Sequence, residues 1–174
     1  MRRIFLLLGF AVLLSSSVLA QQPTHKGYRH SSVQSDLKPV YQRWLSEDVA
    51  YIITPEEKRA FMMLRSDDER EQFIDVFWRR RDMNPATSEN EYRAEHYARI
   101  AYANQNFAFG DVAGWRTDRG RIYITRGKPD ETRKSASGEV WVYRSAPGLG
   151  HNIEVEFVDV NGTGNYQLRL PNQQ

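Results

Sequence analysis

The densest group of chemically capable side chains in this 174-residue chain lies between Gly114 and Gly120. A tryptophan, two arginines, a threonine and an aspartate stand between the two glycines. An aromatic face beside a carboxylate and guanidinium groups suits the recognition of a sugar or a polyanion. With one tyrosine just downstream, these side chains form a candidate binding cluster: Trp115, Arg116, Thr117, Asp118, Arg119 and Tyr123.

The same motif has a structural interpretation in which no side chain needs a ligand. Gly114 permits a tight turn, and Trp115 fills the space between helices and a sheet. Thr117 and Asp118 bond nearby backbone N–H groups, and Asp118 also accepts from an arginine. Gly120 allows a close approach where a strand starts. We favour this interpretation, which predicts that Asp118→Asn costs about 3–5 kcal/mol if the carboxylate and its arginine are buried.

An alternative interpretation makes Asp118 a general acid or base in an enzyme. Glycoside cleavage uses two carboxylates, and Glu91 or Glu95 on a preceding helix is a candidate second one. The sequence does not provide the separation between them, so the enzyme question stays open. The sequence contains no serine-hydrolase, phosphate-loop or zinc-protease signature.

Metal and cofactor chemistry is not indicated. His96 follows Glu95, but no second histidine stands at ligand spacing, so we predict a structural histidine. The segment from Asp159 to Gly164 faintly resembles a calcium loop, which leaves a small calcium-stabilised module as a further hypothesis. It lacks the downstream glutamate of such loops, so a turn is favoured. We predict no metal site and no cofactor.

Helical patterns precede the motif. Apolar residues at i, i+3, i+4 and i+7 predict a helix over 36–51. Capping patterns at Thr54, Ser66 and Ser88 predict three more helices, the last of which ends near Phe107. These helices would position Glu91 and Glu95 relative to the motif.

After the motif, apolar and polar residues alternate with the period of two that is typical of strands. We predict strands over 121–126, 140–143, 153–157 and 166–170. The segment 140–143 is apolar on both faces, which indicates an interior strand. The sequence therefore predicts an α+β fold, in which about four helices pack on one face of a mostly antiparallel sheet of about four strands.

The N-terminus has the pattern of a secretory signal. Arg2 and Arg3 precede an apolar run and then small residues that end at Ala20. The apolar run is shorter than the roughly 20 residues that span a bilayer. We predict cleavage after Ala20, then a flexible linker and a single domain. The linker spans 21–34 and the domain 35–171, divided into a helical part at 35–108, a junction at 110–120 and a strand part at 121–171.

Composition restricts the location and the partners. The chain has no cysteine and a formal net charge of +2. An exported chain without cysteine has neither disulfides nor a thiol for a lipid anchor. We predict a periplasmic or secreted protein, with no stable membrane insertion after cleavage and no nucleic-acid partner. Seven basic and three acidic residues between Arg116 and Lys134 leave open an anion-binding patch as an alternative to pairing within the protein.

Several separated motifs stand in order along the chain, at 44–45, 48–49, 51–54, 77–82, 87–92, 103–107, 114–124, 127–130, 141–143 and 157–159. They resemble, in this order, those of the GWxTD domain family of bacterial envelope proteins. Met83 stands where the family typically has a proline, which affects only a loop. The resemblance covers about 40–170 and implies no established activity. We therefore predict a non-catalytic binding or structural module of the envelope, whose partner is an envelope protein or polysaccharide; the alternative is an envelope polysaccharide hydrolase.

Overall fold

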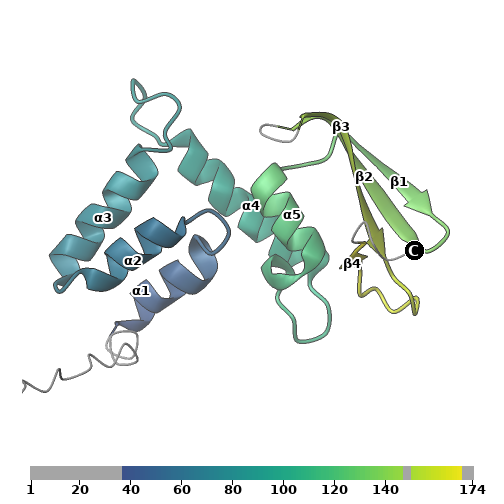
Figure 1. The fold of residues 1–174 in the computed structure, drawn as a ribbon, viewed down its shortest axis with the longest axis horizontal. Helices are drawn as coiled ribbons and strands as arrows, with labels where there is room; N and C mark the ends of the chain where they lie inside the picture. Colours follow the sequence, from purple (N-terminus) through teal and green to yellow (C-terminus); the bar gives the residue numbers. More distant parts are fainter. Residues whose placement is uncertain (1–36, 147–149, 170–174) are drawn as a thin grey trace, which may run out of the picture. The chain divides into compact units, whose positions relative to one another are not determined.

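The computed structural model describes residues 37–146 and 150–169. The predicted signal peptide at 1–20 and linker at 21–34 lie outside these residues. Helices form the first part of the described chain and an antiparallel sheet forms the last part (Figure 1). The fold class is therefore α+β, as the sequence predicted. No helix within the described ranges is long and apolar enough to cross a bilayer.

The helices come first along the chain. They are α1 (Pro39–Arg43), a π-helical turn η1 (Trp44–Asp48), α2 (Pro55–Met63), α3 (Asp67–Arg79), α4 (Glu91–Phe107), a 3-10 turn η2 (Gly114–Arg116) and α5 (Asp118–Arg126). The sheet contains β1 (Glu131–Ser135), β2 (Gly138–Ala146), β3 (Gly150–Val158) and β4 (Gln167–Leu168). The strands lie in the order β1-β2-β3-β4, and each is antiparallel to the next. β1 is therefore an edge strand. β2, which contains the segment 140–143, is interior, as predicted.

Side-chain caps begin the helices close to where the sequence predicts them. Thr54 accepts from the N–H of Glu57, whose carboxylate accepts from the N–H of Thr54 in return. Ser66 begins α3 with the same reciprocal pattern. The cap of α4 is Asn90, which accepts from the N–H of Arg93. The predicted start at Ser88 is therefore two residues early.

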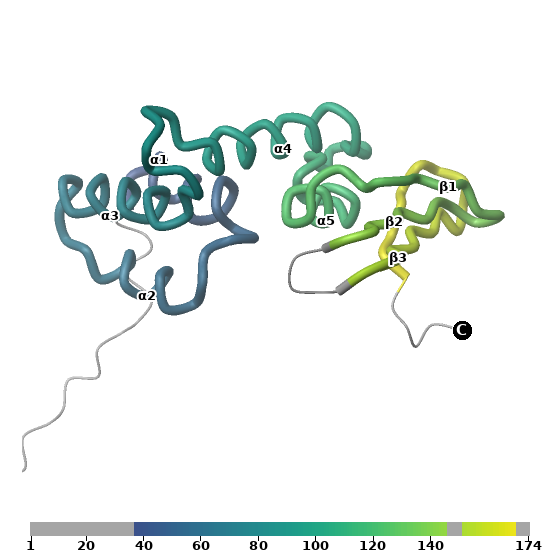
Figure 2. The backbone as a smooth tube through the Cα atoms, turned by 90° about the horizontal axis from the view of Figure 1, so that it is seen from above, coloured from purple at the N-terminus to yellow at the C-terminus, as the bar shows by residue number. Residues whose placement is uncertain are grey.

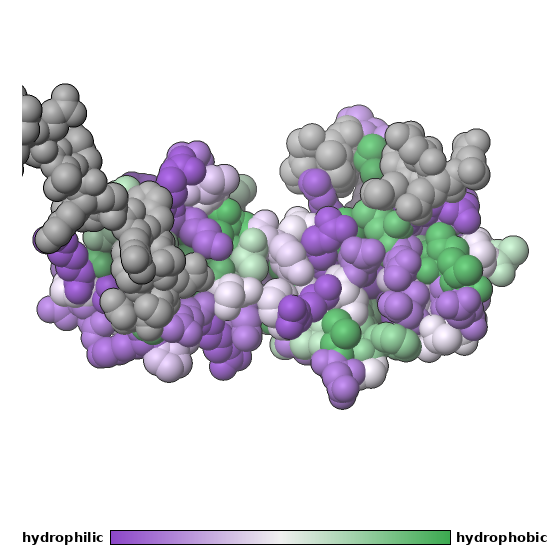
Figure 3. Space-filling view, turned by 60° about the horizontal axis from the view of Figure 1, so that its bottom comes forward, coloured by the Kyte–Doolittle hydropathy of each residue, from purple (hydrophilic) through white to green (hydrophobic). Residues whose placement is uncertain are grey.

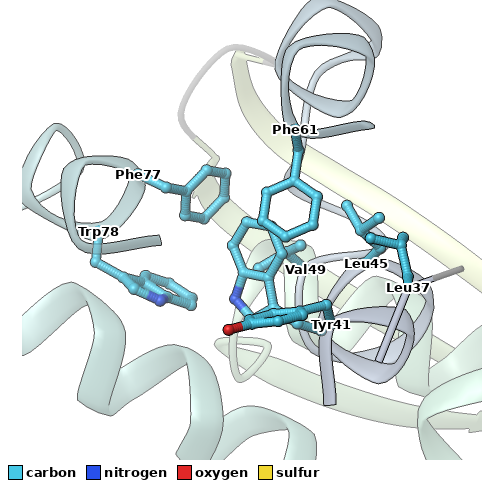
Figure 4. Packing of buried hydrophobic residues seen from close by; sticks show 8 residues of the cluster. Leu37, Tyr41, Leu45, Val49, Phe61, Phe77 and Trp78 are labelled. Atoms are coloured by element: carbon cyan, nitrogen blue, oxygen red, sulfur yellow. The ribbon is translucent and has the colours of Figure 1, made fainter. Parts of the chain in front are cut away.

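Aromatic rings fill the core formed by α1, η1, α2 and α3 (Figure 4). The ring of Trp44 lies 4.9 Å from that of Phe61 and 5.2 Å from that of Phe77, between centroids. Arg81 closes this core from the end of α3, with its guanidinium 3.6 Å from the centroid of Phe77. It also donates to Glu57 at 2.8 Å. The arginine run that ends α3 therefore contributes to packing.

Helix α4 joins the helical core to a second core beneath the sheet (Figure 2). Tyr92 and Tyr97 pack against the helical core, whereas Ala103 and Phe107 belong to the second core. His96 lies between these groups and is only 4% exposed. It is a buried histidine in an aromatic environment, consistent with the structural role predicted for it.

One predicted strand is wrong. Residues 121–126 are not a strand but the greater part of α5. The hydroxyl of Thr117 caps this helix by accepting from the N–H of Gly120 at 3.1 Å. Gly127 ends it in a conformation with φ of 83°. The junction motif therefore connects two helices, and Gly120 lies inside a helix rather than at the start of a strand.

The sheet still has four strands because β1 takes the place of the predicted strand at 121–126. The sequence did not predict β1, whose five residues are all polar. Within the described part of the predicted strand at 166–170, which ends at residue 169, β4 comprises two residues. Asp159 shapes the connection before β4 by accepting from the N–H groups of Thr163 and Gly164, so the segment at 159–164 forms a turn.

The two faces of the sheet differ in chemistry. Trp141, Tyr143 and Phe157 point into the core that the sheet shares with α4 and α5. On the opposite face, Arg133 pairs with Glu131 and Glu154. The prediction that about four helices pack on one face of the sheet therefore holds for α4 and α5, whereas α1, α2 and α3 pack in the separate helical core. Hydrophilic residues predominate on the molecular surface seen in Figure 3, and hydrophobic residues form separate small groups there.

Candidate functional site

The two glycines of the motif allow three backbone segments to touch. A Cβ atom on Gly114 would lie 1.8 Å from the carbonyl oxygen of Ala103 in α4. A Cβ atom on Gly120 would lie 1.9 Å from the carbonyl oxygen of Gly114. Distances below 3.0 Å do not occur for real Cβ atoms. Both positions therefore exclude any side chain, and the contacts fix η2 between α4 and α5.

Thr117 and Asp118 are the polar centre of the motif. Thr117 donates to the carbonyl of Gly114 at 2.8 Å and also caps α5. Asp118 Oδ1 accepts from Arg121 at 3.0 Å, and Oδ2 accepts from the backbone N–H of Leu168 in β4 at 2.8 Å. Both carboxylate oxygens therefore have protein partners, and one of them ties α5 to the last strand.

Trp115 connects the motif to the helical part of the chain. Its ring lies 6.0 Å from that of Tyr51, whose hydroxyl donates to the Trp115 carbonyl at 3.1 Å. The backbone N–H of Trp115 donates to the side-chain oxygen of Asn104 at 3.0 Å. Arg116 is exposed, with its guanidinium 5.7 Å from the Trp115 ring. Trp115 therefore links η2 to Tyr51 and to Asn104 of α4.

Arg119 and Tyr123 face away from Asp118, toward β1 and β2. The guanidinium of Arg119 lies 4.0 Å from the ring centroid of Tyr166 and pairs with Glu139 at 3.5 Å. The ring of Tyr123 stacks on that of Tyr102 at 4.5 Å, with an angle of 14° between the planes. Burial raises the pKa of the Tyr123 hydroxyl, so this hydroxyl stays neutral at physiological pH.

The six candidate residues therefore do not share one site. Arg116, Thr117 and Asp118 line a hollow of about 300 Å³, the Asp118 hollow, together with Phe109, Val112, Asn165 and Tyr166. Arg119 and Tyr123 line another hollow, and Trp115 lines neither. That any of the six contacts a ligand stays a prediction.

The Asp118 hollow offers little to a mechanism with two carboxylates. Among the described residues that line it, Asp118 is the only acid. The helix carboxylates proposed as its partner have other contacts. Glu91 accepts from Thr87 at 2.7 Å, and Glu95 pairs with Arg99 at 2.8 Å. The geometry therefore gives the hydrolase alternative no second carboxylate at this place.

The second hollow was not predicted as a unit. It measures about 270 Å³ and is lined by residues of α4, α5, β1, β2 and the loop before β1; we call it the Tyr102 hollow. Its lining combines aromatic rings with charges of both signs. It consists of Tyr102, Phe107, Arg119, Tyr123, Lys128, Pro129, Asp130, Glu131, Thr132, Glu139 and Trp141.

Of the residues that line this hollow, the sequence analysis predicted only Arg119 and Tyr123 as binding residues. Tyr102 lies five residues before Phe107 on α4, and it was not assigned to a core or a site. The missing information is β1, because that strand and the loop before it supply several of the lining residues of the hollow. No apolar alternation marks β1 in the sequence, so its contribution could not be predicted.

Comparison with known proteins supports the family resemblance that the sequence motifs indicated. The sequence model of the GWxTD domain matches residues 18–172. No curated protein and no solved structure shows a significant match to the chain. The match includes the helical part, the Gly-Trp-Arg-Thr-Asp junction and the sheet. This chain therefore belongs to the GWxTD domain family.

Proposed function

We propose that the protein is an exported, non-catalytic binding module of the bacterial cell envelope, in which the GWxTD motif is a structural brace. The observation that supports this most is the environment of Asp118. One of its oxygens is bonded to Arg121 and the other to the N–H of Leu168. A carboxylate with these partners, and without a second acid in its hollow, fits a structural role better than acid–base catalysis.

The N-terminal sequence supports export. A basic start, a short apolar run and small residues before position 21 are typical of a cleaved secretory signal. The absence of cysteine from the whole chain is compatible with an oxidising compartment in which the fold depends on packing. Mass spectrometry of the protein recovered from the periplasm or the medium tests this point. We expect a mature chain that begins at Gln21; an intact N-terminus would contradict the proposed cleavage.

Binding without turnover is tested with the exported protein and isolated envelope material. The protein is sedimented with purified cell-wall sacculi and, separately, with outer-membrane fragments, and the supernatant is assayed for new reducing ends. We expect saturable binding to one of the two fractions and no release of reducing ends. Failure to bind either fraction would overturn the binding proposal. Release of reducing ends that disappears in Asp118→Asn would instead support the hydrolase.

A further inference from the structure

The Tyr102 hollow has the features of a small ligand site. Residues of β1 and β2 line it, together with the stacked pair of Tyr102 and Tyr123 from α4 and α5. Its volume of about 270 Å³ is close to the lower end, roughly 300 Å³, of typical ligand pockets. Tyr102 remains 43% exposed although it is a large aromatic residue. An exposed ring at the mouth of a hollow is more informative than an isolated surface residue.

The charges around the hollow argue against a simple ion as its ligand. The side chain of Glu131 pairs with Arg133 on the other face of the sheet. Of the other charged residues in the lining, Asp130 and Glu139 would repel an anion, whereas Arg119 and Lys128 would repel a cation. A ligand that suits all four must carry hydrogen-bond donors and acceptors together and little net charge.

Several of these charged groups are already oriented by the protein. Arg119 and Glu139 pair with each other at 3.5 Å, and their side chains are only 16% and 17% exposed. Asp130 accepts from the N–H of Arg144 at 2.7 Å. Lys128 is exposed and has no hydrogen-bond or ion-pair partner among the described residues. It is therefore a free donor at the rim.

Sugars have the required combination of groups. Each hydroxyl both donates and accepts a hydrogen bond, and the C–H face of a pyranose ring is apolar. Aromatic ring faces carry partial negative charge, which attracts the slightly positive C–H groups of such a ring. Tyr102 offers an exposed ring, and Lys128 and Asp130 offer a donor and an acceptor beside it.

We infer that the Tyr102 hollow binds one or two rings of an uncharged saccharide, with Tyr102 as the stacking platform and Lys128 and Asp130 as hydrogen-bonding groups. This inference rests on the proposed binding function and names its ligand class and its place. It places the site outside the Gly114–Gly120 motif, in the Tyr102 hollow. Arg119 is the one residue that belongs to the motif and also lines this hollow.

Isothermal titration calorimetry with three soluble probes tests the inference: an N-acetylglucosamine trimer, a glucose trimer and a galacturonic acid trimer. We expect at least one of the two neutral trimers to bind, and the acidic trimer to bind more weakly. Tyr102→Ala should weaken binding about tenfold, as expected for the loss of a central aromatic contact. Tyr102→Phe keeps the ring and should bind within about twofold of the original protein.

Lys128→Ala gives a second test that does not risk the fold, because Lys128 has no described partner. We expect about a threefold loss of affinity, typical of one hydrogen bond. Lys58→Ala, which removes an exposed lysine from α2, is the matched control and should leave binding unchanged.

The inference is overturned if neither neutral trimer binds, if only the acidic trimer binds, or if Tyr102→Ala and Lys128→Ala bind like the original protein. In each case, continued sedimentation with envelope material would show that the binding function survives and that its site lies elsewhere. Loss of sedimentation as well would remove both proposals.

Discussion

Gly114 lies against the carbonyl of Ala103 so closely that a methyl group at Gly114 would stand 1.8 Å from the carbonyl oxygen. The obstacle is helix backbone, which cannot move aside as a flexible side chain can. We therefore predict that Gly114→Ala lowers the free energy of unfolding by about 3 kcal/mol, at the upper end of overpacking effects. Urea denaturation followed by circular dichroism measures this.

Gly110 provides the control for that substitution. It has a positive φ of 53°, but a Cβ atom there would meet nothing within 4 Å. Gly110→Ala should therefore cost only the backbone strain, about 1 kcal/mol. Equal losses at the two positions would contradict the close contact between η2 and α4.

Arg81 is predicted to be the most important charged residue of the helical core. Its guanidinium lies over Phe77, pairs with Glu57 and also donates to the carbonyl of Ile52 at 3.2 Å. A lysine cannot reproduce this fork, so Arg81→Lys should cost about 2 kcal/mol in a denaturation experiment.

The exposed pair of Arg59 and Glu56 serves for comparison. These side chains are 63% and 71% exposed, so Arg59→Lys should change the stability by less than about 0.5 kcal/mol. If Arg81→Lys proved as mild as Arg59→Lys, the packing role of Arg81 would be refuted.

His96 should make the stability depend on pH. Burial lowers the pKa of His96 in the folded protein, although the hydrogen bond with the Asp48 carbonyl opposes this. An unfolded histidine titrates near 6.5, so the unfolded chain takes up the proton first as the pH falls. The contribution of the neutral His96 ring to the free energy of unfolding is therefore fully present above about pH 6.5. It decreases below that pH, by at most about 1.4 kcal/mol per pH unit.

Urea denaturation between pH 7.5 and pH 5 measures this slope. In His96→Gln the titrating group is absent, and the slope over this range should become flatter whatever the stability of the variant at neutral pH. An unchanged slope in His96→Gln would assign the pH dependence to other groups.

The helical part was predictable because its signals are local. Thr54 and Ser66 form capping boxes with a glutamate three residues later, and both appear in the structure as predicted. The apolar stripe that includes Phe77 and Trp78 predicts the buried face of α3, which packs in the helical core. Such features depend on neighbours within one or two turns, which the sequence displays directly.

The error at α5 arose from competing local signals. Ile122, Tyr123 and Ile124 favour a strand by type and alternation. Signals for a helix were also present. Thr117 followed by an acidic residue marks a helix start, and Gly127 with a proline two residues later marks a helix end. Tertiary contacts decide for the helix, since Ile124 is buried against α4 and the sheet.

The candidate site was only partly predictable because it is assembled from distant segments. The sequence placed Arg119 and Tyr123 beside Asp118, but their side chains leave the helix in another direction and meet β1 and β2. The partner of Asp118, the N–H of Leu168, is fifty positions away in the chain. Backbone partners of this kind leave no mark in the sequence.

The structure also changes the prediction for Asp118. The side chains of Asp118 and Arg121 are 35% and 42% exposed, so their ion pair contributes little, about 0.5 kcal/mol. The larger part comes from the hydrogen bond with Leu168. Asp118→Ala should therefore cost about 1–2 kcal/mol, and Asp118→Asn less, because an amide oxygen still accepts that bond. A loss of about 3–5 kcal/mol in Asp118→Asn would instead indicate a fully buried pair.

The most direct test of the account is the binding of Asp118→Ala to isolated envelope material, measured beside Tyr102→Ala at a temperature at which circular dichroism shows both variants to be folded. If the motif is a brace and the ligand contacts the Tyr102 hollow, Asp118→Ala binds within about twofold of the original protein while Tyr102→Ala binds about tenfold more weakly. A folded Asp118→Ala that no longer binds, beside a Tyr102→Ala that does, would contradict the account and make the GWxTD motif the site itself.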